Sequence, residues 1–127
     1  MKEKISSNGW LLIDKPEGIE SFGVIRKLKF RYSFHKIGFA GTLDPLASGL
    51  LLIGVNKATK KIPNVHNEKK SYIVEIRFGA KTNTLDSEGR FSMMKPISHS
   101  ISDRKYYLKN FVGTYQQKIP NFSAHKS

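Results

Sequence analysis

Short apolar runs separated by polar turns dominate the first half of the chain. Residues 10–13 are apolar and predict a short buried strand, and the proline and glycine that follow are typical of a turn. Apolar residues spaced along one face predict a helix over residues 21–28, with Ser21 as its cap. Residues 50–55 are apolar or glycine throughout, which predicts a central strand covered on both faces.

Between and after these elements the pattern is less regular. Residues 27–36 are basic and aromatic and predict an exposed connection, whereas residues 37–48 are rich in Gly and Pro and predict an ordered loop. A helix is expected to begin at Lys57, and Pro63 limits it.

The second half combines one alternating stretch with polar segments. In residues 72–78 apolar and polar side chains alternate, which predicts a half-buried strand. A polar loop follows over residues 81–89. Ser102 is expected to cap a helix that ends before Gly113, with Asp103 in its first turn, and residues 115–119 are expected to form a strand. Interleaved strands and helices indicate an α+β fold, a mixed sheet with flanking helices.

The charge balance points to a class of partner. The 127 residues include 22 Lys and Arg against 10 Asp and Glu, a formal net charge of +12. This excess must lie at the surface, where it favours nucleic acid first and an anionic membrane second. The absence of cysteine excludes disulfides, thiolate metal sites and a cysteine nucleophile. Because no apolar run could span a bilayer and no signal peptide is visible, we expect a cytoplasmic protein.

The candidate chemistry lies in the segment Gly41-Thr42-Leu43-Asp44-Pro45-Leu46-Ala47-Ser48-Gly49. Asp44 stands just before an apolar strand and is fenced by glycines and a proline, so its carboxylate should be held rigidly where a bulky substrate can approach. Such an aspartate can act as a nucleophile or as a general base. Taken alone, an Asp-Pro pair is more simply explained as the start of a turn.

Several further motifs occur in a fixed order around this segment. They are Trp10-Leu11-Leu12-Ile13-Asp14-Lys15-Pro16 with Gly18 and Ser21, then Lys36 to Leu51, Lys57-Ala58-Thr59-Lys60, Lys70 to Gly89, and Gln117 to Ala124 with Lys126. Together they resemble the TruB family of bacterial tRNA pseudouridine synthases. The resemblance identifies residues 1–127 as the N-terminal portion of a pseudouridine synthase catalytic domain.

The resemblance implies an isomerase that converts uridine 55 in the T-loop of tRNA to pseudouridine. The glycosidic bond breaks, the base turns and a carbon–carbon bond forms, so no cofactor and no metal are expected. Asp44 falls at the catalytic aspartate of the family. Tyr72 falls at its active-site tyrosine, whose ring could stack on the extruded uracil and whose hydroxyl could assist proton transfer. Without the resemblance, packing in the core of an alternating strand is the better explanation of Tyr72.

The partner implied is the T-arm of tRNA, bound by a monomer. The residues expected to contact RNA are Lys15, Lys36, Phe39, Gly41, Thr42, Lys57, Lys60, Ser123 and Lys126. Any one of the lysines could be an ordinary solvated residue, but as a group they favour binding to phosphates.

The chain also departs from the family pattern. Phe39 replaces the usual His, Leu52 a Pro, and His125 a Leu, and Glu20 stands where Ser or Thr is common. Family members are longer, and their second half carries a Lys-Gly-Thr-Tyr-Ile-Arg-type segment whose Arg pairs with the catalytic Asp. That segment and the C-terminal RNA-binding extension do not occur here. We therefore expect an incomplete enzyme with exposed sheet edges and apolar surface.

Two other functions stay open. Phe39 and the short chain favour a non-catalytic RNA-binding or RNA-folding module, whereas intact Asp44 and Tyr72 favour the enzyme. The guide-RNA-dependent synthases of archaea and eukaryotes share the Gly-Thr-Leu-Asp-Pro core, but the residues after it resemble the bacterial stand-alone form more.

Overall fold

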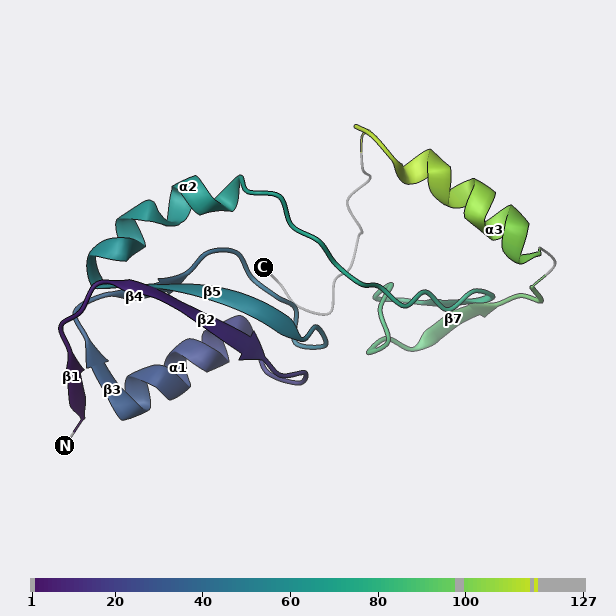
Figure 1. The fold of residues 1–127 in the computed structure, drawn as a ribbon. Helices are drawn as coiled ribbons and strands as arrows, with labels where there is room; N and C mark the ends of the chain where they lie inside the picture. The colour runs from purple at the N-terminus through teal and green to yellow at the C-terminus, as the bar shows by residue number, and fades with distance from the viewer. Residues whose placement is uncertain (1, 98–99, 115, 117–127) are drawn as a thin grey trace. The chain divides into compact units, whose positions relative to one another are not determined.

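The computed structural model describes residues 2–97, 100–114 and 116, and the chain divides into two units, residues 1–71 and 72–127. The first unit is shown in purple to teal in Figure 1. Its elements are β1 (Glu3–Ile5), β2 (Gly9–Lys15), α1 (Ser21–Arg31), β3 (Tyr32–Phe34), β4 (Ile37–Phe39), β5 (Gly49–Val55), the 3-10 helix η1 (Asn56–Lys61) and α2 (Ile62–His66). The α+β class is confirmed, although the strands form small separate sheets.

The main sheet of the first unit has the strand order β2-β5-β4, with both neighbours antiparallel to β5. The prediction of a central strand at residues 50–55 is therefore confirmed. The apolar side chains of one face of β5, Leu51, Ile53 and Val55, are buried together with Val24 and Ile25 of α1. This cluster is the core of the unit, and Figure 1 shows α1 lying along that face.

The other face of the sheet is covered at one end. A methyl group added at Gly54 would lie 3.2 Å from the Trp10 ring, and one at Gly38 would lie 3.3 Å from Ile62 of α2. At the opposite end of the strands, Leu12 is 70% exposed and Leu50 is 64% exposed. The prediction that β5 is covered on both faces is thus correct for its second half only.

Helix α1 differs from its prediction in both its start and its end. Glu20 occupies the N-cap, and its side chain accepts no capping hydrogen bond from the described helix, as expected for a residue that replaces Ser or Thr. Ser21 is the first helical residue, so the prediction that it caps the helix is wrong. The helix continues to Arg31, and β3 and β4 then occupy much of the segment expected to be irregular. Basic residues in its last turn favour this extension, because they interact with the helix dipole.

Asn56, at the end of β5, joins the connection between β1 and β2 to the connection between β3 and β4, a role that no sequence motif predicts. Its side-chain oxygen accepts from the backbone N–H groups of His35 and Lys36, and its amide nitrogen donates to the carbonyls of Ile5 and Ser7 at 3.0 and 2.6 Å. The residue is buried and has φ +55°. Asparagine tolerates this left-handed conformation better than most residues, which is the one signal that its position offered.

The second unit contains a hairpin of β6 (Ala80–Thr82) and β7 (Phe91–Met94), then α3 (Ile101–Leu108) and the 3-10 helix η2 (Lys109–Phe111). Ser100, not Ser102, is the N-cap, and it forms a capping box with Asp103. The predicted position of Asp103 in the first turn is confirmed. The expected strand at 115–119 lies almost wholly outside the described residues.

The predicted strand at residues 72–78 is wrong. This segment is assigned to no strand in the described part of the chain. Both sets of alternating side chains are exposed, for example Ile73 at 106%, Val74 at 70% and Ile76 at 56%. Alternation predicts which faces a strand can bury, but a strand also needs a hydrogen-bonded neighbour, and the pattern does not supply one.

Replacement of Asn56 by Asp tests its role as a junction. Asn56→Asp keeps the acceptor oxygen but places a second oxygen against the carbonyls of Ile5 and Ser7. We expect the free energy of unfolding to fall by about 2–3 kcal/mol, measured by urea denaturation with fluorescence of the chain's single tryptophan, Trp10. Asn64→Asp, at an exposed position of α2, is the matched control and should change it by less than about 0.5 kcal/mol.

Candidate active site

Asp44 lies in the loop that joins β4 to β5. Its carbonyl accepts the N–H of Ala47 at 3.0 Å, which closes a four-residue turn with Pro45 at the second position. Asp and Pro are preferred at those two positions of a turn. Gly41, ahead of the turn, has φ +86°, where a side chain would be strained. The simple interpretation of Asp-Pro as a turn is therefore correct, and the turn itself presents the carboxylate.

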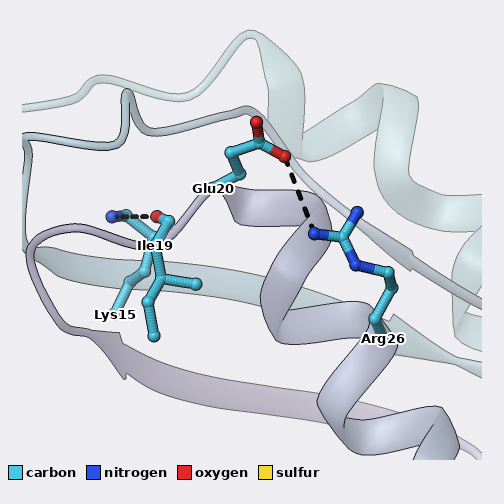
Figure 2. Close-up of polar contacts among 4 residues, drawn as sticks. All are labelled: Lys15, Ile19, Glu20 and Arg26. Carbon is cyan, nitrogen blue, oxygen red and sulfur yellow. Dashed lines mark hydrogen bonds and ion pairs between the residues drawn. The ribbon is translucent and has the colours of Figure 1, made fainter.

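Pro45, which follows Asp44, is held by groups from the end of β2 and the turn after it. Its carbonyl accepts the Gly18 N–H at 2.7 Å and the Lys15 ammonium at 3.3 Å. The same ammonium donates to the carbonyls of Ile19 at 2.7 Å and Pro16 at 3.0 Å. Figure 2 shows the Lys15 side chain directed at the Ile19 carbonyl, beside the start of α1.

Leu43, which precedes Asp44, is held by the first residue of α1. The Ser21 hydroxyl accepts the Leu43 N–H at 2.8 Å and donates to the Leu43 carbonyl at 2.9 Å. The Leu43 side chain also packs against the core. The neighbouring ion pair of Glu20 and Arg26 in Figure 2, at 3.8 Å, is exposed and contributes little stability.

The Asp44 side chain itself is exposed. Among the residues that the structure describes, no cation lies within ion-pair distance of its carboxylate. Its backbone is thus fixed on both sides while its oxygens stay accessible. This arrangement can present a nucleophile or a general base to a large substrate.

Lys15 does not fit its predicted role in RNA binding. Its side chain is fully buried, and its ammonium is occupied by three carbonyl oxygens. A buried charge needs such partners, because losing water costs several kcal/mol otherwise. The structure therefore makes Lys15 a support of the Asp44 loop rather than a contact for phosphates.

Three of the other predicted lysines, Lys36, Lys57 and Lys60, are exposed, and their backbones lie close together. The Lys36 carbonyl accepts the N–H of Asn56 at 2.7 Å, so Lys36 lies next to the start of η1. Lys57 and Lys60 are three residues apart on that 3-10 helix and share one face. This group lies at the end of the seven-residue strand β5 that is opposite Asp44, about 20 Å away at the usual strand rise.

The remaining predicted residues are not gathered at one point. Phe39 is half-buried in β4 and packs against the core. Gly41 is half-buried and Thr42 is exposed, both on the Asp44 loop. Tyr72 begins the second unit and is 65% exposed. Ser123 and Lys126 lie outside the described residues.

No three His, Asp or Glu side chains of residues 2–97, 100–114 and 116 converge as metal ligands. In that same part of the chain, each helix is too short or too polar to cross a bilayer.

Comparison with known sequences identifies the family. Residues 27–127 match the pseudouridylate synthases, in the group described as "TruB family pseudouridylate synthase (N terminal domain)". The chain belongs to the TruB family. This match includes Asp44 and the whole loop that carries it.

Individual relatives support the same family, but the chain aligns with only part of each of them. The chain is 40% identical over 119 residues to tRNA pseudouridine synthase B of Roseobacter denitrificans, and 43% identical over 118 residues to that of Fusobacterium nucleatum. The aligned part is 94% and 93% of this chain but 39% and 41% of those proteins. The chain therefore spans about two fifths of the length of the curated relatives that it matches.

Removal of the Lys15 ammonium tests its support of the loop. Lys15→Met keeps most of the side-chain volume but leaves the part-buried carbonyls of Pro16, Ile19 and Pro45 without this donor. We expect the free energy of unfolding to fall by about 2 kcal/mol, measured by urea denaturation with Trp10 fluorescence. Lys36→Met, at an exposed position, should change it by less than about 0.5 kcal/mol. Equal stability of Lys15→Met and the wild type would mean that the hydrogen bonds only offset the cost of burying the charge.

Proposed function

We propose that the chain is the N-terminal part of the catalytic domain of a tRNA pseudouridine synthase that isomerises uridine 55 in the T-loop. Asp44 is its catalytic carboxylate. The proposal is carried by one observation: an exposed aspartate whose two neighbours, Leu43 and Pro45, are both tied to the β2–α1 segment. Family membership and the names of the relatives support the substrate class.

The reaction is balanced without a further reagent. The bond between N1 of uracil and C1′ of ribose breaks, the base turns, and a bond forms between C5 and C1′. N1 gains a proton and C5 loses one, so the product is an isomer of the substrate. Asp44 supplies a negative charge fixed in position, either to attack as a nucleophile or to accept a proton. Because the loop is preorganised, little energy is needed to orient the carboxylate at the moment of reaction.

The target uridine must be flipped out of the T-loop to reach Asp44, because the reacting atoms of a stacked base are inaccessible. Tyr72 is proposed to stack on the extruded uracil or to assist proton transfer. Lys36, Lys57 and Lys60 are proposed to contact phosphates of the T-arm away from the reacting nucleotide, because β5 separates them from Asp44.

A second candidate is a non-catalytic RNA-binding or RNA-folding module. It is favoured by Phe39, which has no hydrogen-bonding group and packs against the core. In this case the basic surface binds the T-arm and no uridine is isomerised.

Asp44→Asn separates the two candidates. With a T-arm stem-loop that carries tritium at C5 of the target uridine, the wild-type chain should release tritium, because C5 loses its hydrogen. Asp44→Asn should slow the release by at least about a thousandfold and leave binding, measured by fluorescence anisotropy, unchanged within about threefold. Asp14→Asn, at an exposed position of β2, is the control and should keep full activity. Binding without release by the wild type would favour the non-catalytic module.

The salt dependence of binding tests the lysine group. If Lys36, Lys57 and Lys60 each contact a phosphate, replacing all three by Gln should reduce the slope of log K against log salt by about 2–3. The matched control replaces Lys27, Lys29 and Arg31, which are exposed on α1, and removes the same charge. An equal change of slope in both triple variants would show that net charge, not this group, determines binding.

A further inference from the structure

Ser21 lies where a capping serine is expected, but its hydroxyl bonds to the Asp44 loop and not to its own helix. The N-cap of α1 is Glu20, and the Ser21 hydroxyl makes two hydrogen bonds to Leu43, 22 residues further along the chain. Ser21 is 4% exposed. A hydroxyl has one donor and two acceptor sites, so this one group satisfies the N–H and the carbonyl of the same residue.

The contact matters because Leu43 directly precedes Asp44 in the loop. Pro45 is held from the other side by Lys15 and Gly18. Asp44 is thus the single residue between two fixed points. Loss of the Leu43 contact would free the backbone torsions that precede Asp44 and change the direction of its carboxylate, while the Pro45 contact would remain.

We infer that Ser21 is a positioning residue for Asp44, acting through the backbone of Leu43. The inference rests on the proposed function of Asp44. A displacement of a reacting group by about 1 Å can reduce a rate about a hundredfold, so one hydrogen-bonding group at this point has a large effect on turnover. Binding of the T-arm through distant phosphates does not depend on it.

A simple role in helix stability is separable from this one. Ser21 caps nothing in the described helix, and alanine is a better helix former than serine. Ser21→Ala should therefore leave α1 intact and act only through the loop. Ser21→Thr keeps a hydroxyl and is the conservative variant. Ser33→Ala, at an exposed position of β3, is the matched control.

The first measurement is amide hydrogen exchange by NMR on the full 127-residue chain. Exchange at the Leu43 N–H should be at least about tenfold faster in Ser21→Ala than in the wild type, and near wild type in Ser21→Thr and Ser33→Ala. Chemical shifts of Asp44 should move in Ser21→Ala while those of Asp14 stay fixed. Unchanged Leu43 exchange or unchanged Asp44 shifts in a folded Ser21→Ala chain would overturn the inference.

The second measurement is tritium release from the labelled stem-loop. Ser21→Ala should lower kcat by about 10- to 100-fold with little change in KM, and Ser21→Thr should restore most of it. A normal kcat in Ser21→Ala, or a rise in KM alone, would contradict a positioning role. If the wild-type chain releases no tritium, the proposed catalysis by this chain fails. The exchange rate of Leu43 and the shifts of Asp44 then still decide whether Ser21 orients the loop.

Discussion

The buried ammonium of Lys15 is the constraint around which the site is organised. A charge removed from water must find oxygen partners, and here they are backbone carbonyls from the turn after β2 and from Pro45. Satisfying one cation therefore brings together two segments that are 30 residues apart. The hydrogen bonds between Ser21 and Leu43 connect the same two segments. The position of Asp44 follows from these contacts, from the hydrogen bond between the Gly18 N–H and the Pro45 carbonyl, and from the turn of its own loop.

Much of the first unit could be predicted from sequence because its signals are local. The apolar run at 50–55 and the spacing of Val24 and Ile25 each define a buried face, and the structure packs these faces against one another. The rigid Asp44 loop was likewise predicted from its glycines and proline. Where a residue's partner is remote, the local pattern is misleading or silent. It predicts Ser21 as a helix cap and Lys15 as an RNA contact, and it gives no sign of the contacts of Asn56.

In the second unit, the local pattern predicts a strand that the structure does not contain. Apolar and polar side chains alternate in residues 72–78 as in a strand. Alternation does not provide a hydrogen-bonded partner strand, and the segment is exposed. Pairing is a long-range property, whereas capping is local. The helix cap predicted at Ser102 lies at Ser100, two residues earlier, and Asp103 is in the first turn as predicted. The role of Tyr72 could be predicted only from family resemblance and stays a prediction.

The strand order β2-β5-β4 has a consequence for synthesis of the chain. The central strand is the last of the three to be made, and β2 and β4 are never neighbours. While a ribosome extends the chain, the two outer strands have no partner in this sheet until β5 is made. Closure of the sheet is then a single late event, in which one strand completes two ladders at once. The Asp44 loop leads directly into that strand, and the residues that hold the loop, Lys15, Gly18 and Ser21, have all been made before it.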